Sequence, residues 1–334
     1  MFSIIILRNV SWRINMPTVA QYLDGLLVGN AAVYQGLWIF PVCLVSAEFE
    51  KTNEEFASIS ESLKKGKAFV YETGEMDRVR IINRGSARLA GIESETLIGG
   101  AQNRILNGGM VISPGIEADL PSSCVEVKRW DCVAGAENPV PADKAGFKNT
   151  DFGFASLRRL KIGEAIHSLR VERKIKIDQQ KVWEHIVKQF GLTGAKSGTL
   201  DLHDLYEFYD SPLKMFSYRF TVVRNQVGMI AFHDKRTWFM DIFANRDLLF
   251  RNFKKLVRSH SFDALVKLES KTGIPSRMYP GLEEARDVFK KVKTAQSHEF
   301  KSGDSRHMFF STSKFSGMAM LDESHLIHLA ACSE

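Results

Sequence analysis

The run Leu37-Trp-Ile-Phe-Pro-Val-Cys-Leu-Val45 is apolar at almost every position. A short, nearly continuous apolar run of this kind is typical of a strand that is buried on both faces. Pro41 cannot donate a backbone hydrogen bond, so we expect the strand to be irregular at that point. The sequence therefore predicts a buried strand early in the chain.

The text after this run indicates one helix followed by short strands. Thr52-Asn-Glu-Glu55 has the pattern of a capping box, and Phe56, Ile59 and Leu63 fall on one helix face, with Gly66 after the last turn. Short strands are predicted at residues 68–72, 79–83 and 87–91. This part of the chain therefore resembles a β-sandwich or a strongly curved sheet.

The C-terminal half alternates helices with strands. Asp178 caps a helix in which Val182, Trp183, Ile186 and Phe190 fall at helical spacing. Further helices are predicted at residues 202–209, 245–269 and 282–292, and further strands at 218–223, 228–232, 237–243, 308–311, 317–321 and 326–331. We predict an α+β fold with a mainly antiparallel sheet, sandwich-like in its N-terminal part, and several packed helices in the C-terminal half.

Domain boundaries follow from the distribution of proline, glycine and apolar residues. Residues 131–156 contain several glycines, two prolines and few aliphatic side chains, which predicts a surface connection. It separates a strand-rich part, 22–130, from a mixed helix and strand part, 157–331. Residues 1–21 are an N-terminal extension, either disordered or forming an ordinary first strand near its start.

Composition limits the classes of partner and compartment. The chain has 334 residues and a formal net charge of +6, an excess too small to predict nucleic-acid binding, and its basic cluster at 158–176 is interpreted as a solvated face. Four cysteines without a repeating spacing favour a reducing, cytoplasmic compartment. No segment reaches transmembrane length, so no membrane association is expected.

The densest polar text is Gly99-Gly-Ala-Gln-Asn-Arg104, followed by Cys124-Val-Glu-Val-Lys-Arg-Trp130. Amide side chains beside a guanidinium can bind a carboxylate, a phosphate or a ribose edge, and they can equally close a structural turn. If residues 124–130 form a strand, Cys124, Glu126, Lys128 and Trp130 share one face and Arg129 lies on the other.

Evidence for catalysis in these motifs is weak. Glu126 on the same face as Cys124 would raise the pKa of the thiol, which argues against a nucleophilic cysteine. No histidine precedes His167, so a catalytic pair would need a long-range partner such as His325 or His328. Catalytic candidates are Glu126, Cys124 and His328, but the sequence does not establish that the protein is an enzyme. No metal site, cofactor or phosphate-binding glycine loop is predicted.

Both motifs, in order and at similar spacing, resemble the ARG- and rhodanese-phosphatase-superfamily-associated protein domain family, a poorly characterised prokaryotic family. The resemblance extends over roughly residues 22–331, which implies a single module. Where the family has Ala-Lys before Gln-Asn-Arg, this chain has Gly100-Ala101, and where it has Gln-Gly before Arg-Trp, this chain has Val127-Lys128. The resemblance marks signature positions without assigning them a catalytic role.

The resemblance implies proximity to ADP-ribose or nucleotide chemistry, in a conflict or repair setting. The leading hypothesis is a ligand-binding or accessory protein for such a metabolite. Its ligand-binding candidates are Gln102, Asn103, Arg104, Lys128, Arg129 and Trp130, with Trp130 stacking on the ligand. One alternative is a hydrolase or transferase that uses Glu126 with Cys124 or a C-terminal histidine. Another is a structural protein that forms a homo-oligomer or binds a partner enzyme.

Overall fold

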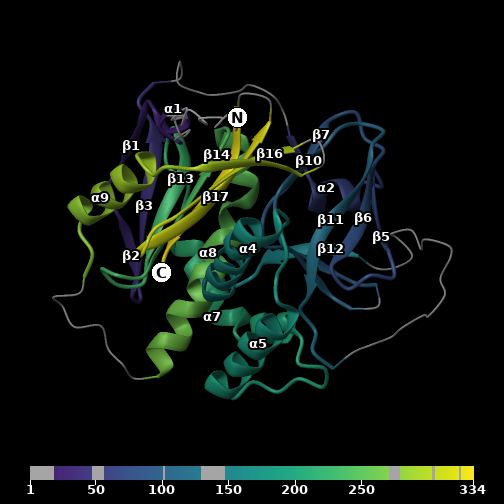
Figure 1. Ribbon diagram of the computed structural model, residues 1–334. Helices are drawn as coiled ribbons and strands as arrows, with labels where there is room; N and C mark the ends of the chain where they lie inside the picture. Colours follow the sequence, from purple (N-terminus) through teal and green to yellow (C-terminus); the bar gives the residue numbers. More distant parts are fainter. Residues whose placement is uncertain are drawn as a thin grey trace, which may run out of the picture.

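The computed structural model describes residues 19–46, 56–100, 102–128, 147–270, 279–302, 305–322 and 325–334. They form a sandwich of two smaller sheets beside one large sheet, with helices between and around them (Figure 1). Apart from one parallel strand pair, β4 with β7, the strand pairs of these residues are antiparallel. The predicted α+β class is therefore confirmed.

The sandwich is built from residues 56–124 and one later strand. Its elements are β4 (Phe56–Ser58), α2 (Ile59–Lys64), β5 (Ala68–Glu72), β6 (Arg78–Asn83), β7 (Arg88–Gly91), β8 (Glu95–Ile98), β9 (Arg104–Leu106), β10 (Met110–Ile112), β11 (Glu117–Cys124) and β12 (Lys148–Phe152). The strand orders are β12-β8-β9-β11-β6-β5 and β10-β7-β4. Val70, Ile81, Leu89 and Leu106 are fully buried between the two sheets. Alternating apolar positions therefore fill the sandwich core.

The nine-stranded sheet combines strands from both ends of the chain. Its strands are β1 (Leu26–Val28), β2 (Ala32–Tyr34), β3 (Leu37–Leu44), β13 (Gln226–Phe232), β14 (Trp238–Phe243), β15 (His298–Ser302), β16 (Ser305–Ser311), β17 (Phe315–Asp322) and β18 (His325–Ser333). Its order is β1-β3-β13-β14-β18-β17-β16-β15, and β2 also pairs with β3. Pro41 lies in β3 opposite the gap between β1 and β2, where Gly29 donates to its carbonyl. The strand predicted from this apolar run is confirmed, but it runs through Pro41 without interruption, and the register shift against β13 lies between Gln226 and Gly228.

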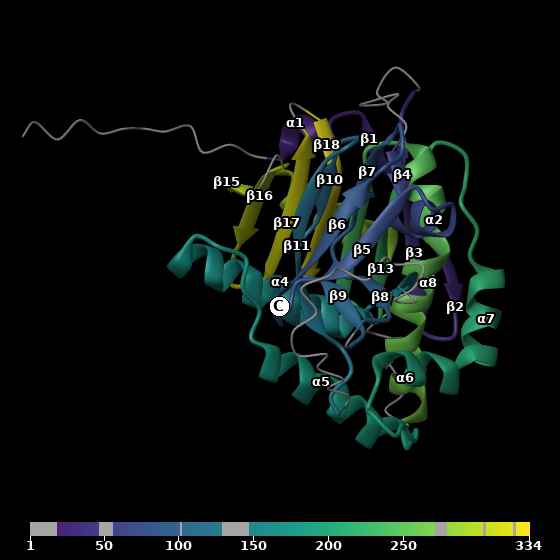
Figure 2. The same cartoon turned by 90° about the vertical axis from the view of Figure 1, so that its right-hand side faces the viewer.

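Helices cover both faces of the nine-stranded sheet and fill the space beside the sandwich. They are α1 (Ala20–Leu23), α4 (Ala155–Glu172), α5 (Gln179–Thr193), α6 (Leu202–Phe208), α7 (Asp210–Arg219), α8 (Arg246–Glu269) and α9 (Leu282–Lys293). Asp178 and Asn245 accept backbone hydrogen bonds as the N-caps of α5 and α8. Figure 2 shows the sandwich in front of the large sheet, with α5 and α6 below both.

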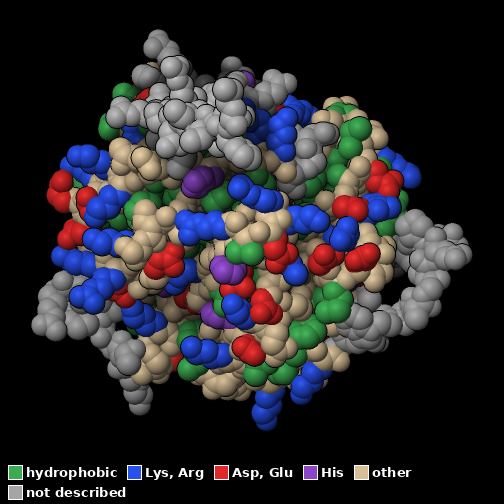
Figure 3. All heavy atoms as spheres, in the orientation of Figure 1, with side chains coloured by type: hydrophobic (Ala, Val, Ile, Leu, Met, Phe, Trp, Pro, Cys, Tyr) green, Lys and Arg blue, Asp and Glu red, His purple; other side chains and the backbone are tan. Residues whose placement is uncertain are grey.

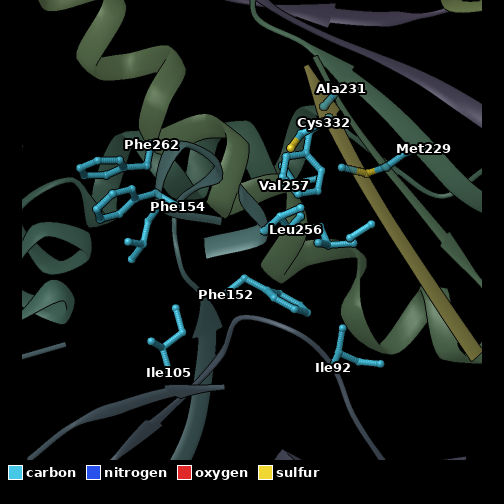
Figure 4. Packing of buried hydrophobic residues seen from close by; sticks show 14 of the residues in the cluster. Ile92, Ile105, Phe152, Phe154, Met229, Ala231, Leu256, Val257, Phe262 and Cys332 are labelled. Atoms are coloured by element: carbon cyan, nitrogen blue, oxygen red, sulfur yellow. The ribbon is translucent and has the colours of Figure 1, made fainter. Parts of the chain in front are cut away.

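The two sheet systems share one apolar core. Phe152 lies between Ile92 and Ile105 of the sandwich and Leu256 of α8 (Figure 4). Phe154 stacks on Phe262 of α8 with ring centroids 4.7 Å apart. Such aromatic pairs add to the burial of their own apolar area. The chain segment that follows the sandwich is therefore anchored to the longest helix.

Several predicted elements differ from the structure. The strand predicted at 218–223 is wrong, because α7 continues to Arg219. The helix predicted from Phe56 begins at Ile59 and has Ser58 as its N-cap. It begins later than predicted because residues 56–58 form a strand that pairs with β7. The predicted capping box at 52–55 lies outside the described residues. The connection at 131–156 contains β12, and its residues 131–146 are not described. The condition considered for residues 124–130, that they form one strand, is not met in the described part of this segment, since β11 ends at Cys124.

Helix α4 was missed because its buried face carries charges. Arg158 and Lys161 are completely buried, whereas exposed apolar Val171 lies near its end. These cations interrupt the apolar stripe of Leu157, Ile162 and Ile166, on which periodicity arguments rest. The interpretation of residues 158–176 as one solvated basic face is therefore wrong for its first half.

Candidate functional site

The first signature motif forms the turn between β8 and β9. Gly99 and Gly100 both have positive φ angles, of 130° and 65°, which favour glycine. A Cβ atom on Gly100 would collide with the side chains of Glu72 and Phe147. The two glycines are therefore required by this turn, and Ala101 lies outside the described residues.

Gln102 and Asn103 are buried and bind neighbouring parts of the chain. The Gln102 amide donates to the Glu126 carbonyl oxygen at 2.9 Å. Asn103 donates to Asp201 Oδ2 at 2.7 Å and accepts from the Gly99 amide at 2.8 Å. The backbone amide of Asn103 lies 3.5 Å from Glu126 Oε2. These side chains therefore connect the signature turn to the segment after β11 and to the start of α6.

Arg104 and Cys124 face each other across β9 and β11. Arg104 donates to Glu72 at 2.8 Å, to the Met76 carbonyl at 2.7 Å and to Cys124 Sγ at 3.0 Å. Burial raises the pKa of the Cys124 thiol to about 11, despite the nearby guanidinium. The thiol is therefore protonated near neutral pH, where it accepts a hydrogen bond instead of acting as a nucleophile.

Of the remaining predicted site residues that the structure describes, only Glu126 contacts Gln102 and Asn103. Lys128 is exposed, and its amide donates to the Thr199 carbonyl at 2.8 Å. Glu126 is buried and forms an isolated bridge with Asp201. His328 lies in β18, where its Nε2 is 3.0 Å from Asp241. Arg129 and Trp130 lie outside the described residues.

His328 belongs to a buried charge network that the sequence did not predict. Arg158 binds Asp241 through two hydrogen bonds, of 2.7 and 3.1 Å, and its Nε lies 3.5 Å from Glu93. Lys161 binds Ser94 Oγ at 3.1 Å and also donates to the Leu106 carbonyl. Because Glu93 belongs to the sandwich and Asp241 to the large sheet, α4 links the two through buried ion pairs. Such a network holds elements in register, and breaking one pair is strongly destabilising.

A second buried group, a series of hydrogen-bonded side chains, resembles a catalytic relay in its residue types. Asp201 Oδ1 lies 3.2 Å from His203 Nδ1, and His203 Nε2 lies 3.2 Å from Thr96 Oγ1. The Thr96 hydroxyl, however, donates to the Asp151 carbonyl at 2.6 Å, and Thr96 is completely buried. A nucleophile needs access to a substrate and a base that accepts its proton. This hydrogen-bonded series therefore has a structural role.

A solvent-accessible cleft lies directly beside β11, the strand that ends at Cys124 of the second motif. Its first cavity, of about 280 Å³, is lined by Met76, Asp77, Arg78, Asn107, Ser122, Ser123, Glu172, Lys174, Ile175, Lys176, Ile177 and Gln179. A second, of about 300 Å³, shares four of these residues and adds Asp119, Pro121, Arg173, Phe300 and Lys301. We call the two cavities together the basic cleft.

Gln179 ties the basic cleft to the second motif. Its amide donates to the Cys124 carbonyl at 2.8 Å, and its Oε1 accepts from the Cys124 amide at 2.8 Å. These two hydrogen bonds fix the start of α5 against the end of β11, where Ser122 and Ser123 line the cleft. Cys124 of the second motif thus holds one wall of the cleft in place without lining it.

Sequence reasoning named some cleft residues but did not recognise a site. Arg173, Lys174 and Lys176 were part of the predicted basic cluster. Their partners across the cleft, Arg78 and Ser122, lie about 50 to 100 positions earlier in the chain, and no spacing rule connects them.

The fold and the cleft define an α+β protein with a polar surface cleft supported by buried signature motifs. Residues 25–332 match the family model described as the ARG and Rhodanese-Phosphatase-superfamily-associated Protein domain, and the chain belongs to this family. No curated protein and no solved structure matches it significantly. Helices of the described residues include none long and apolar enough to span a membrane. Within the same residues, no group of three or more His, Cys, Asp or Glu side chains is arranged to hold a metal ion.

Proposed function

We propose that this protein is a ligand-binding or accessory protein for ADP-ribose or another nucleotide, and that the ligand occupies the basic cleft. The observation that carries the proposal is a pair of cations, Arg173 and Lys174, which line the cleft and have no ion-pair partner among the described residues. A phosphate group of the ligand would pair with them.

The charges of the cleft favour an anionic ligand. Its acidic residues are neutralised in place: Asp77 binds Arg78, Asp119 binds Arg80, and Glu172 lies 3.7 Å from Lys176. Arg173 and Lys174 have no ion-pair partner among the described residues, although both line the cleft. These two cations are therefore available to a phosphate group.

The dimensions and backbone of the cleft agree with a nucleotide-sized ligand. Cavities of about 280 and 300 Å³ joined through Arg78 and Lys174 approach the range of small-molecule sites. Phe300, whose ring stacks on His307, also lines the second cavity and gives it an aromatic side chain. Arg173, with a φ angle of 58°, is the left-handed C-cap at which α4 ends, and residues 174–177 that follow it line the cleft.

This proposal moves the ligand away from the signature side chains themselves. Gln102, Asn103 and Arg104 are buried and bound to other parts of the chain, so they support the cleft rather than line it. Lys128, the remaining described residue of the predicted site, does not line either cavity.

The test is a thermal stability screen with ADP-ribose, NAD, ATP, cyclic nucleotides and short RNA. A ligand at a hundredfold excess over its dissociation constant adds about 2.7 kcal/mol to the free energy of unfolding. We expect a nucleotide to stabilise the wild type and the control Lys188→Glu, and to stabilise Lys174→Glu much less. If no nucleotide stabilises the wild type, or if RNA alone does, the proposal is wrong.

A further inference from the structure

The outer edge of β1 carries a second surface with the features of a peptide-binding groove. We infer that an extended, acidic segment of a partner protein binds there as an added strand, between β1 and α9. Figure 1 shows α9 beside β1 at the end of the nine-stranded sheet. This inference does not depend on the ligand proposed for the basic cleft.

The backbone of β1 leaves hydrogen-bonding groups directed away from the sheet. Leu27 pairs with Cys43, and the flanking bonds run from Val45 to the Gly25 carbonyl and from Gly29 to the Pro41 carbonyl. In an antiparallel pair the hydrogen-bonded positions alternate, so the amides and carbonyls of Leu26 and Val28 point outward. No strand of the described residues covers this edge. An added strand would satisfy these groups.

An apolar groove runs alongside the open edge. It has a volume of about 310 Å³ and is lined by Leu26, Leu27, Val28, Arg286, Phe289, Lys290 and Lys293. Leu27 is 60% exposed, whereas Leu26 and Val28 on either side of it are buried against the face that carries α9. Such a groove accepts the apolar side chains of a strand, while the backbone bonds provide affinity.

The charges of α9 determine the chemistry of the occupant. Arg286, Lys290 and Lys293 follow one another at helical spacing along the groove. Arg286 binds Glu283 and Lys293 binds Asp24, but Lys290 has no ion-pair partner among the described residues. An acidic strand complements this row, whereas the chain's own residues 1–18 carry Arg8 and Arg13 and no acidic residue. Charge complementarity therefore favours an acidic partner.

The first experiment measures binding of a fluorescein-labelled peptide, acetyl-Glu-Val-Glu-Val-Glu-Val-Glu-amide, by fluorescence anisotropy at low ionic strength. The full-length wild type should bind it saturably, and the double variant Arg286→Glu with Lys290→Glu should bind about tenfold more weakly. The matched control is Lys291→Glu, because Lys291 binds Asp287 and does not line the groove. Absence of binding, equal binding of the Lys-Val counterpart peptide, or an equal loss in the control overturns the inference.

Hydrogen exchange identifies the position of the bound strand. The amides of Leu26 and Val28 should exchange more slowly when the acidic peptide is bound, because only strand addition protects outward-facing amides of an edge. Protection confined to other segments overturns the inference. Two further results assign the edge to a different occupant and also overturn it. One is faster exchange at these amides after removal of residues 1–18, and the other is a concentration-dependent dimer that protects them.

Discussion

Arg104 lies under the signature turn with three partners and almost no exposure to solvent. Its guanidinium binds the Glu72 carboxylate, the Met76 carbonyl and the Cys124 thiol. Arginine suits this position because its planar group directs several donors at once. At the scale of the residue, the motif is therefore a device that holds β9, β11 and the loop before β6 together.

Replacing this arginine tests its structural role. Arg104→Ala should lower the free energy of unfolding by about 3 kcal/mol, since it leaves buried acceptors and the Glu72 carboxylate without a partner. Urea unfolding followed by circular dichroism measures the loss. Lys128→Ala, at an exposed signature position, should stay within about 0.5 kcal/mol of the wild type. Equal stability of the two variants would show that Arg104 is not a structural residue.

Individual side chains could be selected from the sequence, but their partners could not. The first motif indicated that residues 102–104 either contact a ligand or form a structural turn. In the structure their side chains bind other residues of the protein: Glu126, Asp201 and Glu72. Ser122 gave no signal, because a serine in a strand is unremarkable until its surroundings are known. Hydrogen-bond partners far apart in sequence decide both cases.

Helix α4 shows how an element can be organised by buried charge. Lys161 and Arg158 face the interface between the sandwich and the large sheet, where they bind Glu93, Asp241 and the Leu106 carbonyl. This arrangement also explains why the helix escaped prediction, although the strongly amphipathic α9 and the capped α5 and α8 were predicted near their observed bounds. Apolar periodicity identifies an element poorly where buried charges interrupt its apolar face, as they do in α4.

The buried amine of Lys161 makes stability depend on pH in a defined direction. Burial lowers its pKa to about 8, below the value of about 10.4 in an unfolded chain. Between these values the unfolded state binds a proton that the folded state has released, so the free energy of unfolding rises with pH in this window. Below about pH 8 both states are protonated and the contribution is constant.

Lys161→Met isolates this effect, since other titrating groups are common to both proteins. The difference in free energy of unfolding, wild type minus variant, should increase between pH 8 and pH 10 in chemical denaturation experiments. A difference that is constant over this window would show that Lys161 keeps its proton in the folded protein.

At the scale of the whole molecule, the sandwich, the large sheet and the helices meet along the segment from Phe152 to Gln179. This segment crosses the shared core, passes through the charge network in α4 and then forms one wall of the basic cleft. The α+β class could be predicted because it depends on local patterns. The cleft could not, because β6, β11, β15 and the segment after α4 meet only in the folded chain.

On the face shown in Figure 3, the interspersed charges would suit a small ligand better than a long polyanion. Lysine and arginine side chains alternate with acidic ones over the face shown in Figure 3. Proteins that bind nucleic acid instead collect basic residues in a continuous patch or stripe. Cations concentrated in one cleft therefore favour a compact anionic ligand.

The most direct test of the basic cleft is equilibrium binding by isothermal titration calorimetry, using the nucleotide that stabilises the wild type most. Lys174→Glu should weaken binding about tenfold or more, and Arg173→Ala should also weaken it, because both cations line the cleft without an ion-pair partner among the described residues. Lys128→Glu should bind as the wild type does. Loss of binding in Lys128→Glu, with Lys174→Glu and Arg173→Ala unaffected, would place the ligand outside the basic cleft and contradict this account.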